Sequence, residues 1–192
     1  MKKVFLGLVV SSLLTVPVLA QAATWEIDGA HTTVTFKVRH LLTKVTGTFQ
    51  QVSGEIEFDP SNPTAGSASV TIPVSSIDTR NEKRDGHLKS GDFFDAENYP
   101  DLTFKSTKFV KSDSGLKIEG VLNMRGVDKP VTLDVEFLGS QAAMGGEIAG
   151  FSASTKINRN DWGISWNKTL DTGTLLGDDV EIQIDVEARK KG

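Results

Sequence analysis

Alternation of apolar and polar residues is the feature that most constrains the fold of this chain. In TVTFKVRH, residues 33–40, an extended backbone puts Val34, Phe36 and Val38 on one side and lysine and threonine on the other. This period of two predicts a β-strand with one buried and one solvated face. Parallel sheets bury both faces of each strand, so the alternation favours an antiparallel sheet.

The same alternation recurs along the chain and predicts about eight strands in all. We expect the other seven at residues 54–59, 67–74, 101–106, 115–124, 130–137, 151–157 and 179–188. Turn-forming residues such as Asp59-Pro60 separate the runs. Eight antiparallel strands with one apolar face can form a sandwich or close into a barrel, and such a barrel holds either its own side chains or one small ligand.

Small residues interrupt the expected inward rows. Gly54, Ala68, Gly120 and Ala153 stand among larger apolar residues. Two interpretations are open: small inward residues leave room for a guest molecule, or they relieve crowding where strands coil tightly.

The first 22 residues have the pattern of a cleaved secretory signal. Lys2 and Lys3 precede an apolar run at residues 4–16, and Ala20-Gln21-Ala22 fits the small-x-small cleavage rule. The apolar run is shorter than the roughly 20 residues that span a bilayer. We therefore expect a mature, soluble domain at residues 23–192, exported to the periplasm.

Charge and composition narrow the function classes. The chain has a net charge of −4, which becomes −6 when the two signal lysines are removed. This balance argues against nucleic acid as a partner, and we expect no stable membrane insertion. The chain has no cysteine, so disulfides, thiol catalysis and cysteine-held metals are excluded. We expect no cofactor and no metal site; the association state is left open, a homodimer included.

One segment departs from the strand period. TRNEKRDGHLKS, residues 79–90, is polar, and Thr79 followed by Glu82 matches a capping box that starts a helix. Gly86 inside the segment implies a short or broken helix. We expect a helical flap at one end of a barrel, held by a polar cluster. The residues expected in this cluster are Asp28, His31, Arg84, Asp85 and His87.

Four longer motifs resemble a known family. They are DGAHTTVTFKVRHL, SIDTRNEKRDGHLKSGDFFDAENYPDLTFKS, GVLNMRGVDKPVTL and INRNDWGI, in that order along the chain. Together they resemble the YceI-like family of periplasmic polyisoprenoid-binding proteins. The resemblance implies an extended, eight-stranded, antiparallel lipocalin-like barrel with a short helical segment. It also implies an apolar pore for a long isoprenoid, such as a polyprenyl or prenylquinone-like lipid, or a related amphiphile.

An apolar pore of this kind needs hydrophobic walls more than placed polar groups. We expect Phe93 and Phe94 to turn inward from the flap segment. The full set of expected ligand-binding residues is Phe36, Val38, Phe49, Ile56, Val70, Ile72, Phe93, Phe94, Phe104, Leu122, Phe137, Phe151 and Trp162.

Two alternatives to a carrier are open. Asp85 and His87 form the one plausible acid–base pair, which would make the chain an enzyme on a lipid-like substrate. Carboxylates such as Glu55 and Glu57 lie on outward rows, so a solvated face explains them better. A barrel filled by its own side chains would instead indicate a stress or interaction factor. The favoured interpretation is a binding protein with no catalytic residues.

The signal pattern makes a direct prediction about the mature protein. Intact-mass analysis of the exported form should give a chain that begins at Ala23 and fractionates with soluble periplasmic protein. A membrane-bound form that retains residues 1–22 would contradict it.

Overall fold

The computed structural model describes residues 22–113, 115–143, 145–171 and 173–192, so the expected signal segment lies outside the described residues except for Ala22. The strands are β1 (Ala23–Ile27), β2 (Thr33–His40), β3 (Thr43–Phe49), β4 (Ser53–Phe58), β5 (Ser67–Pro73), β6 (Ile77–Asp78), β7 (Asp101–Ser112), β8 (Gly115–Met124), β9 (Val127–Ala143), β10 (Gly146–Asn158), β11 (Thr169–Leu170), β12 (Gly173–Thr174) and β13 (Leu176–Lys190). The helices are α1 (Glu82–Lys89) and the short 3₁₀ turns η1 (Pro63–Ala65), η2 (Val74–Ser76) and η3 (Arg159–Trp162).

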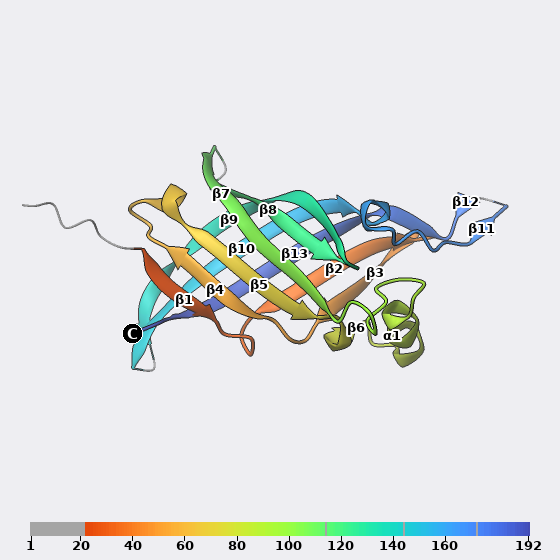
Figure 1. Cartoon of the computed structure of the whole chain (residues 1–192), viewed down its shortest axis with the longest axis horizontal. Helices are drawn as coiled ribbons and strands as arrows, with labels where there is room; N and C mark the ends of the chain where they lie inside the picture. Colours follow the sequence, from red (N-terminus) through yellow and green to blue (C-terminus); the bar gives the residue numbers. More distant parts are fainter. Residues whose placement is uncertain (1–21, 114, 144, 172) are drawn as a thin grey trace, which may run out of the picture.

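The strands close into an elongated antiparallel barrel (Figure 1). Over the described residues, pairing runs β1-β4-β5-β7-β8-β9-β10-β13 and returns from β13 to β1, which closes a ring of eight. Helix α1 and the β11–β12 hairpin lie at one end, and β1 and the C-terminus lie at the other (Figure 1). The barrel expectation is thus confirmed, and the open sandwich is not formed.

Three of the eight positions in the barrel are each shared by two short strands. Along one edge of β13, β2 pairs with its first part and β1 with its last part. In the same way, β3 and β4 share the next position, where β3 pairs with β2 and β4 with β1. β6 and β5 share the position after that, where β6 pairs with β3 and β5 with β4. The three breaks, at residues 28–32, 50–52 and 74–76, lie side by side: Gln50 N donates to Ser76 O at 2.9 Å, and a Cβ on Gly29 would lie 2.7 Å from the Val52 oxygen. The breaks therefore form one line across neighbouring strands, with β1, β4 and β5 on one side and β2, β3 and β6 on the other.

Each predicted strand occupies one of the eight positions, but three further strands of the barrel, β1, β3 and β6, and the β11–β12 hairpin were not predicted. β1 is only five residues long, and β6 only two. β3 has the sequence TKVTGTF, in which threonines and Gly47 break the apolar alternation. These strands exist because a neighbour offers free backbone groups, which a single-sequence pattern does not register.

A bulge lets β7 run longer than its predicted span of 101–106. The register with β8 shifts between Ser106 and Lys108, which leaves Thr107 as the additional residue. The shift changes the phase of the alternation, so Phe104 and Phe109 both face the interior.

Some of the small inward residues relieve crowding between strands, and others leave space in the barrel interior. A Cβ on Gly120 would meet the Phe104 ring at 2.4 Å and the Lys105 carbonyl oxygen at 2.7 Å, and one on Gly54 would meet the Ser69 oxygen at 2.1 Å. These glycines therefore relieve crowding. Ala68 and Ala153 instead line the interior cavity and leave space in it.

The close contact at Gly120 predicts a stability change. Gly120→Ala should lower the free energy of unfolding by about 1–3 kcal/mol, because the new methyl group overpacks the wall. Chemical denaturation measures the change. Gly86→Ala is the matched control: its site in α1 is open, so it should stabilise the protein by about 0.5–1 kcal/mol through helix propensity. Equal effects of the two substitutions would refute the packing argument.

Candidate functional site: an apolar cavity inside the barrel

A cavity of about 580 Å³ occupies the barrel interior. Inward apolar residues of β2, β4, β5, β7, β8, β9, β10 and β13 form its wall, so the alternation of every long strand contributes to it. Its volume falls in the range of small-molecule sites. The barrel is therefore not filled by its own side chains.

Most of the residues predicted from sequence lie on the wall of this cavity. Eleven of the thirteen line it: Phe36, Val38, Phe49, Ile56, Val70, Ile72, Phe93, Phe94, Phe104, Leu122 and Phe151. Phe93 and Phe94 come from the segment after α1, and Phe94 packs edge-on against Phe49 with ring centroids 6.0 Å apart. The inward turn of these two residues is thus confirmed.

Phe137 does not line the cavity but belongs to an aromatic cluster beside it. Its ring centroid lies 5.0 Å from that of Phe58 and 5.3 Å from that of Phe151, and the Phe58 and Phe151 centroids are 5.3 Å apart. Phe58 is buried in β4 and pairs with Ala23 of β1. The cluster therefore fills the barrel at its β1 end.

Trp162 was also predicted to line the cavity and does not. It is buried in η3, where its indole Nε1 donates to the Leu122 carbonyl at 3.1 Å. The lining tryptophan is Trp166, in the extended segment after η3. Sequence reasoning missed Trp166 because this segment has neither strand nor helix periodicity.

Helix α1 covers the other end of the barrel and starts differently from the prediction. Its N-cap is Asn81, whose side-chain oxygen accepts from Arg84 N at 3.0 Å. Thr79, the expected cap, is buried instead and anchors the helix. The Thr79 N–H and hydroxyl donate to Asp85 Oδ1, and Arg84 donates through Nε to the Thr79 hydroxyl and through Nη2 to its carbonyl, both at 2.7 Å.

The expected single polar cluster is divided among separate places, so the predicted link from Arg84 and Asp85 to Asp28 or His31 is wrong. Asp28 follows β1, where its Oδ2 lies 3.1 Å from His31 Nδ1 and accepts from Arg189 Nε at 3.0 Å. The hydrogen bond from His31, followed by that from Arg189, lowers the pKa of Asp28. Alternation along single strands does not predict these neighbours, because they depend on the pairing of β1 with β13.

The proposed acid–base pair of Asp85 and His87 is not formed. Asp85 is bound to Thr79, whereas His87 Nε2 lies 2.8 Å from Asp92 Oδ2. The His87 ring packs edge-on against Phe93 and Trp166, with centroids 5.0 and 4.9 Å away. His87 lines the cavity, and its contacts join the flap to the Trp166 segment.

One group of side chains has the composition of a metal site. In the described part of the chain, one group of three side chains could approach an ion: Asp28, His31 and Glu187. Asp28 Oδ2 already accepts a hydrogen bond from the Arg189 cation, which disfavours a second cation there. No helix among the described residues has the length and apolarity of a membrane span.

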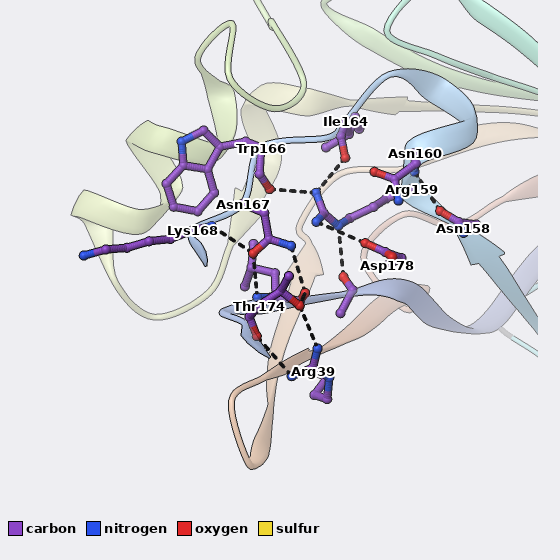
Figure 2. Close-up of polar contacts among 12 residues, drawn as sticks. Arg39, Asn158, Arg159, Asn160, Ile164, Trp166, Asn167, Lys168, Thr174 and Asp178 are labelled. Atoms are coloured by element: carbon purple, nitrogen blue, oxygen red, sulfur yellow. Dashed lines mark hydrogen bonds and ion pairs between the residues drawn. The ribbon is translucent and has the colours of Figure 1, made fainter. Parts of the chain in front are cut away.

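Two arginines hold the segments that close the α1 end. Arg125 donates through Nη2 to Gly91 O at 2.8 Å and through Nη1 to Gly163 O at 2.6 Å, which joins the flap to the segment after η3. Arg159 donates through Nη1 to Ile164 O at 2.6 Å and to Trp166 O at 2.9 Å (Figure 2).

Arg159 is 5% exposed and lines the cavity. Its Nη2 makes no hydrogen bond with the described residues, and the nearest carboxylate oxygen, Asp178 Oδ1, is 3.5 Å away. Burial lowers the pKa of Arg159, and the charge of Asp178 opposes this. An arginine keeps its proton even so, and the wall therefore contains a buried positive charge.

Comparisons with known proteins agree on one family. The model of the YceI-like domain matches residues 25–188. A protein YceI of Salmonella arizonae and a UPF0312 protein of Enterobacter sp. strain 638 are each 40% identical, with 97% of both chains covered. A UPF0312 protein of Vibrio cholerae is 38% identical over 85% of this chain and 89% of its own.

Solved structures share the fold. A mutant of the Campylobacter jejuni YceI protein is 39% identical with a TM-score of 0.71, covering 86% of this chain and 96% of its own. Burkholderia cenocepacia BcnA is 26% identical with a TM-score of 0.73, covering 84% and 98%. A polyisoprenoid binding domain from Saccharophagus degradans is 15% identical with a TM-score of 0.65, covering 88% and 99%, which shows a common fold.

The anchor at Thr79 predicts how the flap responds to mutation. Asp85→Ala should lower the free energy of unfolding by about 1–3 kcal/mol, because the buried donors of Thr79 lose their acceptor. Amide hydrogen exchange should also speed up in residues 79–96. Glu82→Ala is the control: it removes an exposed acid from the same helix and should leave that exchange nearly unchanged. If both variants exchange like the parent, Asp85 does not anchor the flap.

Proposed function

Because the chain belongs to the YceI-like family, we propose that it is a periplasmic binding or carrier protein for a long isoprenoid or related amphiphilic lipid. The polyprenyl or prenylquinone-like tail would lie inside the barrel. The mature domain would be residues 23–192, released by cleavage of the signal segment.

The single observation that carries this proposal is the apolar cavity of about 580 Å³ inside the closed barrel. A prenyl tail has only apolar surface, and burial contributes about 0.8 kcal/mol for each methylene-sized group before ordering costs. Phenylalanines and branched aliphatic residues from all sides of the barrel provide matching walls. A long tail would therefore bind with few polar contacts.

The similar proteins add support of two kinds. The barrel of a polyisoprenoid binding domain from Saccharophagus degradans has the same fold, so this architecture is compatible with such a ligand. The relatives of higher identity place the chain in one family over nearly its whole length. The function itself rests on the cavity, because a fold alone does not specify one.

Binding without catalysis is the better account of the polar residues at the cavity. His87 contacts Asp92 and two aromatic rings, and Asp85 bonds to Thr79. Both sets of contacts hold the flap in place. We therefore propose no catalytic residue.

The cavity predicts how affinity depends on tail length. Neutral prenyl alcohols of increasing length should bind more tightly by roughly tenfold or more per isoprene unit until the cavity is full. Val70→Phe and Leu122→Trp should end this gain at a shorter tail, because both side chains line the cavity. Calorimetric titration of the delipidated protein measures each affinity, because the three tryptophans of the chain and the one added by Leu122→Trp would mix in a fluorescence signal.

The matched control is Ser69→Phe, which adds the same ring to β5 at an exposed position. Its tail-length dependence should equal that of the parent, and thermal unfolding should confirm that all three variants fold. Flat affinity across tail lengths in the parent would exclude the carrier proposal.

A further inference from the structure

The turn between β2 and β3 carries two exposed leucines. The strands pair up to the two residues that connect them, Leu41 and Leu42. Leu41 is 42% exposed, and Leu42 is fully exposed. Among the described residues, the other exposed large apolar side chains are those of Tyr99 and Leu138, which are far apart in the sequence. Within the described chain, two such side chains are therefore adjacent only at the tip of this hairpin.

The turn itself does not favour leucine. Leu41 has a φ of 53°, in the left-handed region, where a bulky side chain is strained and glycine or asparagine is favoured. Two-residue hairpin turns with a positive φ usually contain such residues. Leucine at both positions therefore strains the backbone and leaves apolar surface in water. A pair of residues that opposes both folding and solubility indicates another role.

The hairpin tip adjoins the cavity at the end where the β11–β12 hairpin lies (Figure 1). Leu41 N donates to Leu175 O at 2.9 Å, and both Leu175 and His40 line the cavity. Arg39 Nη1 donates to the carbonyl oxygens of Leu41 and Thr174, at 3.1 and 3.5 Å, which ties the turn to β12 (Figure 2). The two leucines are thus held beside the cavity by contacts with neighbouring segments.

The charges around the two leucines are mainly positive. Four charged residues belong to the tip and to the segment bonded to it: Arg39, Lys44, Lys168 and Asp171. These three cations and one anion give a net charge of +2 with histidine neutral, in a chain with a net charge of −4. The nearby acids of β13 each face a cation: Glu181 faces Lys44, Asp179 faces Lys156 and Asp178 faces Arg159. An apolar point with basic residues around it matches an anionic partner.

We propose that the β2–β3 tip docks reversibly on an anionic phospholipid bilayer by inserting Leu41 and Leu42 among the lipid chains. A stable protein interface buries roughly 800 Å² on each partner, which two leucines on a protruding turn cannot provide. A bilayer accepts a small apolar point, while the flanking lysine and arginine side chains stay at the headgroups. The inference goes beyond the proposed function, because it concerns how the protein meets a membrane and not what fills the tube.

Vesicle sedimentation tests the docking with the processed protein, residues 23–192, which contains every described strand and lacks the apolar run at residues 4–16. The vesicles contain phosphatidylcholine and phosphatidylglycerol in equal amounts. The parent should bind, and salt should weaken its binding. Leu41→Asn combined with Leu42→Ser should lower the partition coefficient at least about tenfold, because burial of leucine side chains would be lost. The same variant should unfold at an equal or higher temperature, because asparagine tolerates the positive φ.

Leu138→Ser is the matched control, because it removes an exposed leucine of β9 away from the tip. It should bind vesicles like the parent, whereas Leu42→Ser alone should lose at least about threefold. Since the chain has no cysteine, a polarity-sensitive dye can be attached at Leu42→Cys or at Leu138→Cys. Vesicles should shift the emission to shorter wavelength only for the dye at Leu42→Cys.

Three results would refute the docking: no vesicle binding by the parent, equal binding by the double variant, or an equal loss in Leu138→Ser. If the parent ignores vesicles but forms a dimer that the double variant separates into monomers, the tip is a contact between copies and the bilayer proposal is wrong. The affinity of the double variant for prenyl alcohol should equal that of the parent, so these results leave the proposed function to its own test.

Discussion

The closure of one alternating sheet onto itself is the constraint on which the rest of this structure depends. β13 makes the closure: it pairs with β10 on one edge and with β2 and then β1 on the other. In a closed sheet, every strand must keep the phase of its neighbours, because a shift of one residue would turn its apolar row outward. Closure therefore directs the inward rows of all eight positions into one enclosed volume.

The two ends of that volume differ in physical character. Aromatic rings fill the β1 end, where Phe58, Phe137 and Phe151 contact one another. At the α1 end, the covering segments are held mainly by side chains that bond to backbone groups, as Arg125 does to Gly91 and Gly163. The α1 end is also the end at which Lys83, Arg84 and His87 line the cavity.

Sequence reasoning recovered what depends on local periodicity and missed what depends on pairing. The inward rows, such as Val34, Phe36 and Val38, were assigned correctly because alternation alone defines them. Phe137 was placed on the cavity wall because the same alternation does not tell which part of a long strand meets the cavity. Thr79 was assigned to a helix cap, although the fold buries it between Arg84 and Asp85. Arg159 gave no signal, since its environment comes from segments after η3 that have no periodicity.

Photocrosslinking tests most directly whether a prenyl tail lies inside the barrel, as proposed. A prenyl alcohol with a diazirine at the end of its tail would be bound to the delipidated protein, irradiated, and mapped by peptide mass spectrometry. The structure predicts labels on inward residues of the barrel wall, such as Ile118 and Val135, and loss of labelling when unlabelled prenyl alcohol competes. Labels confined to outward residues, such as Leu138, which is 61% exposed, would contradict it.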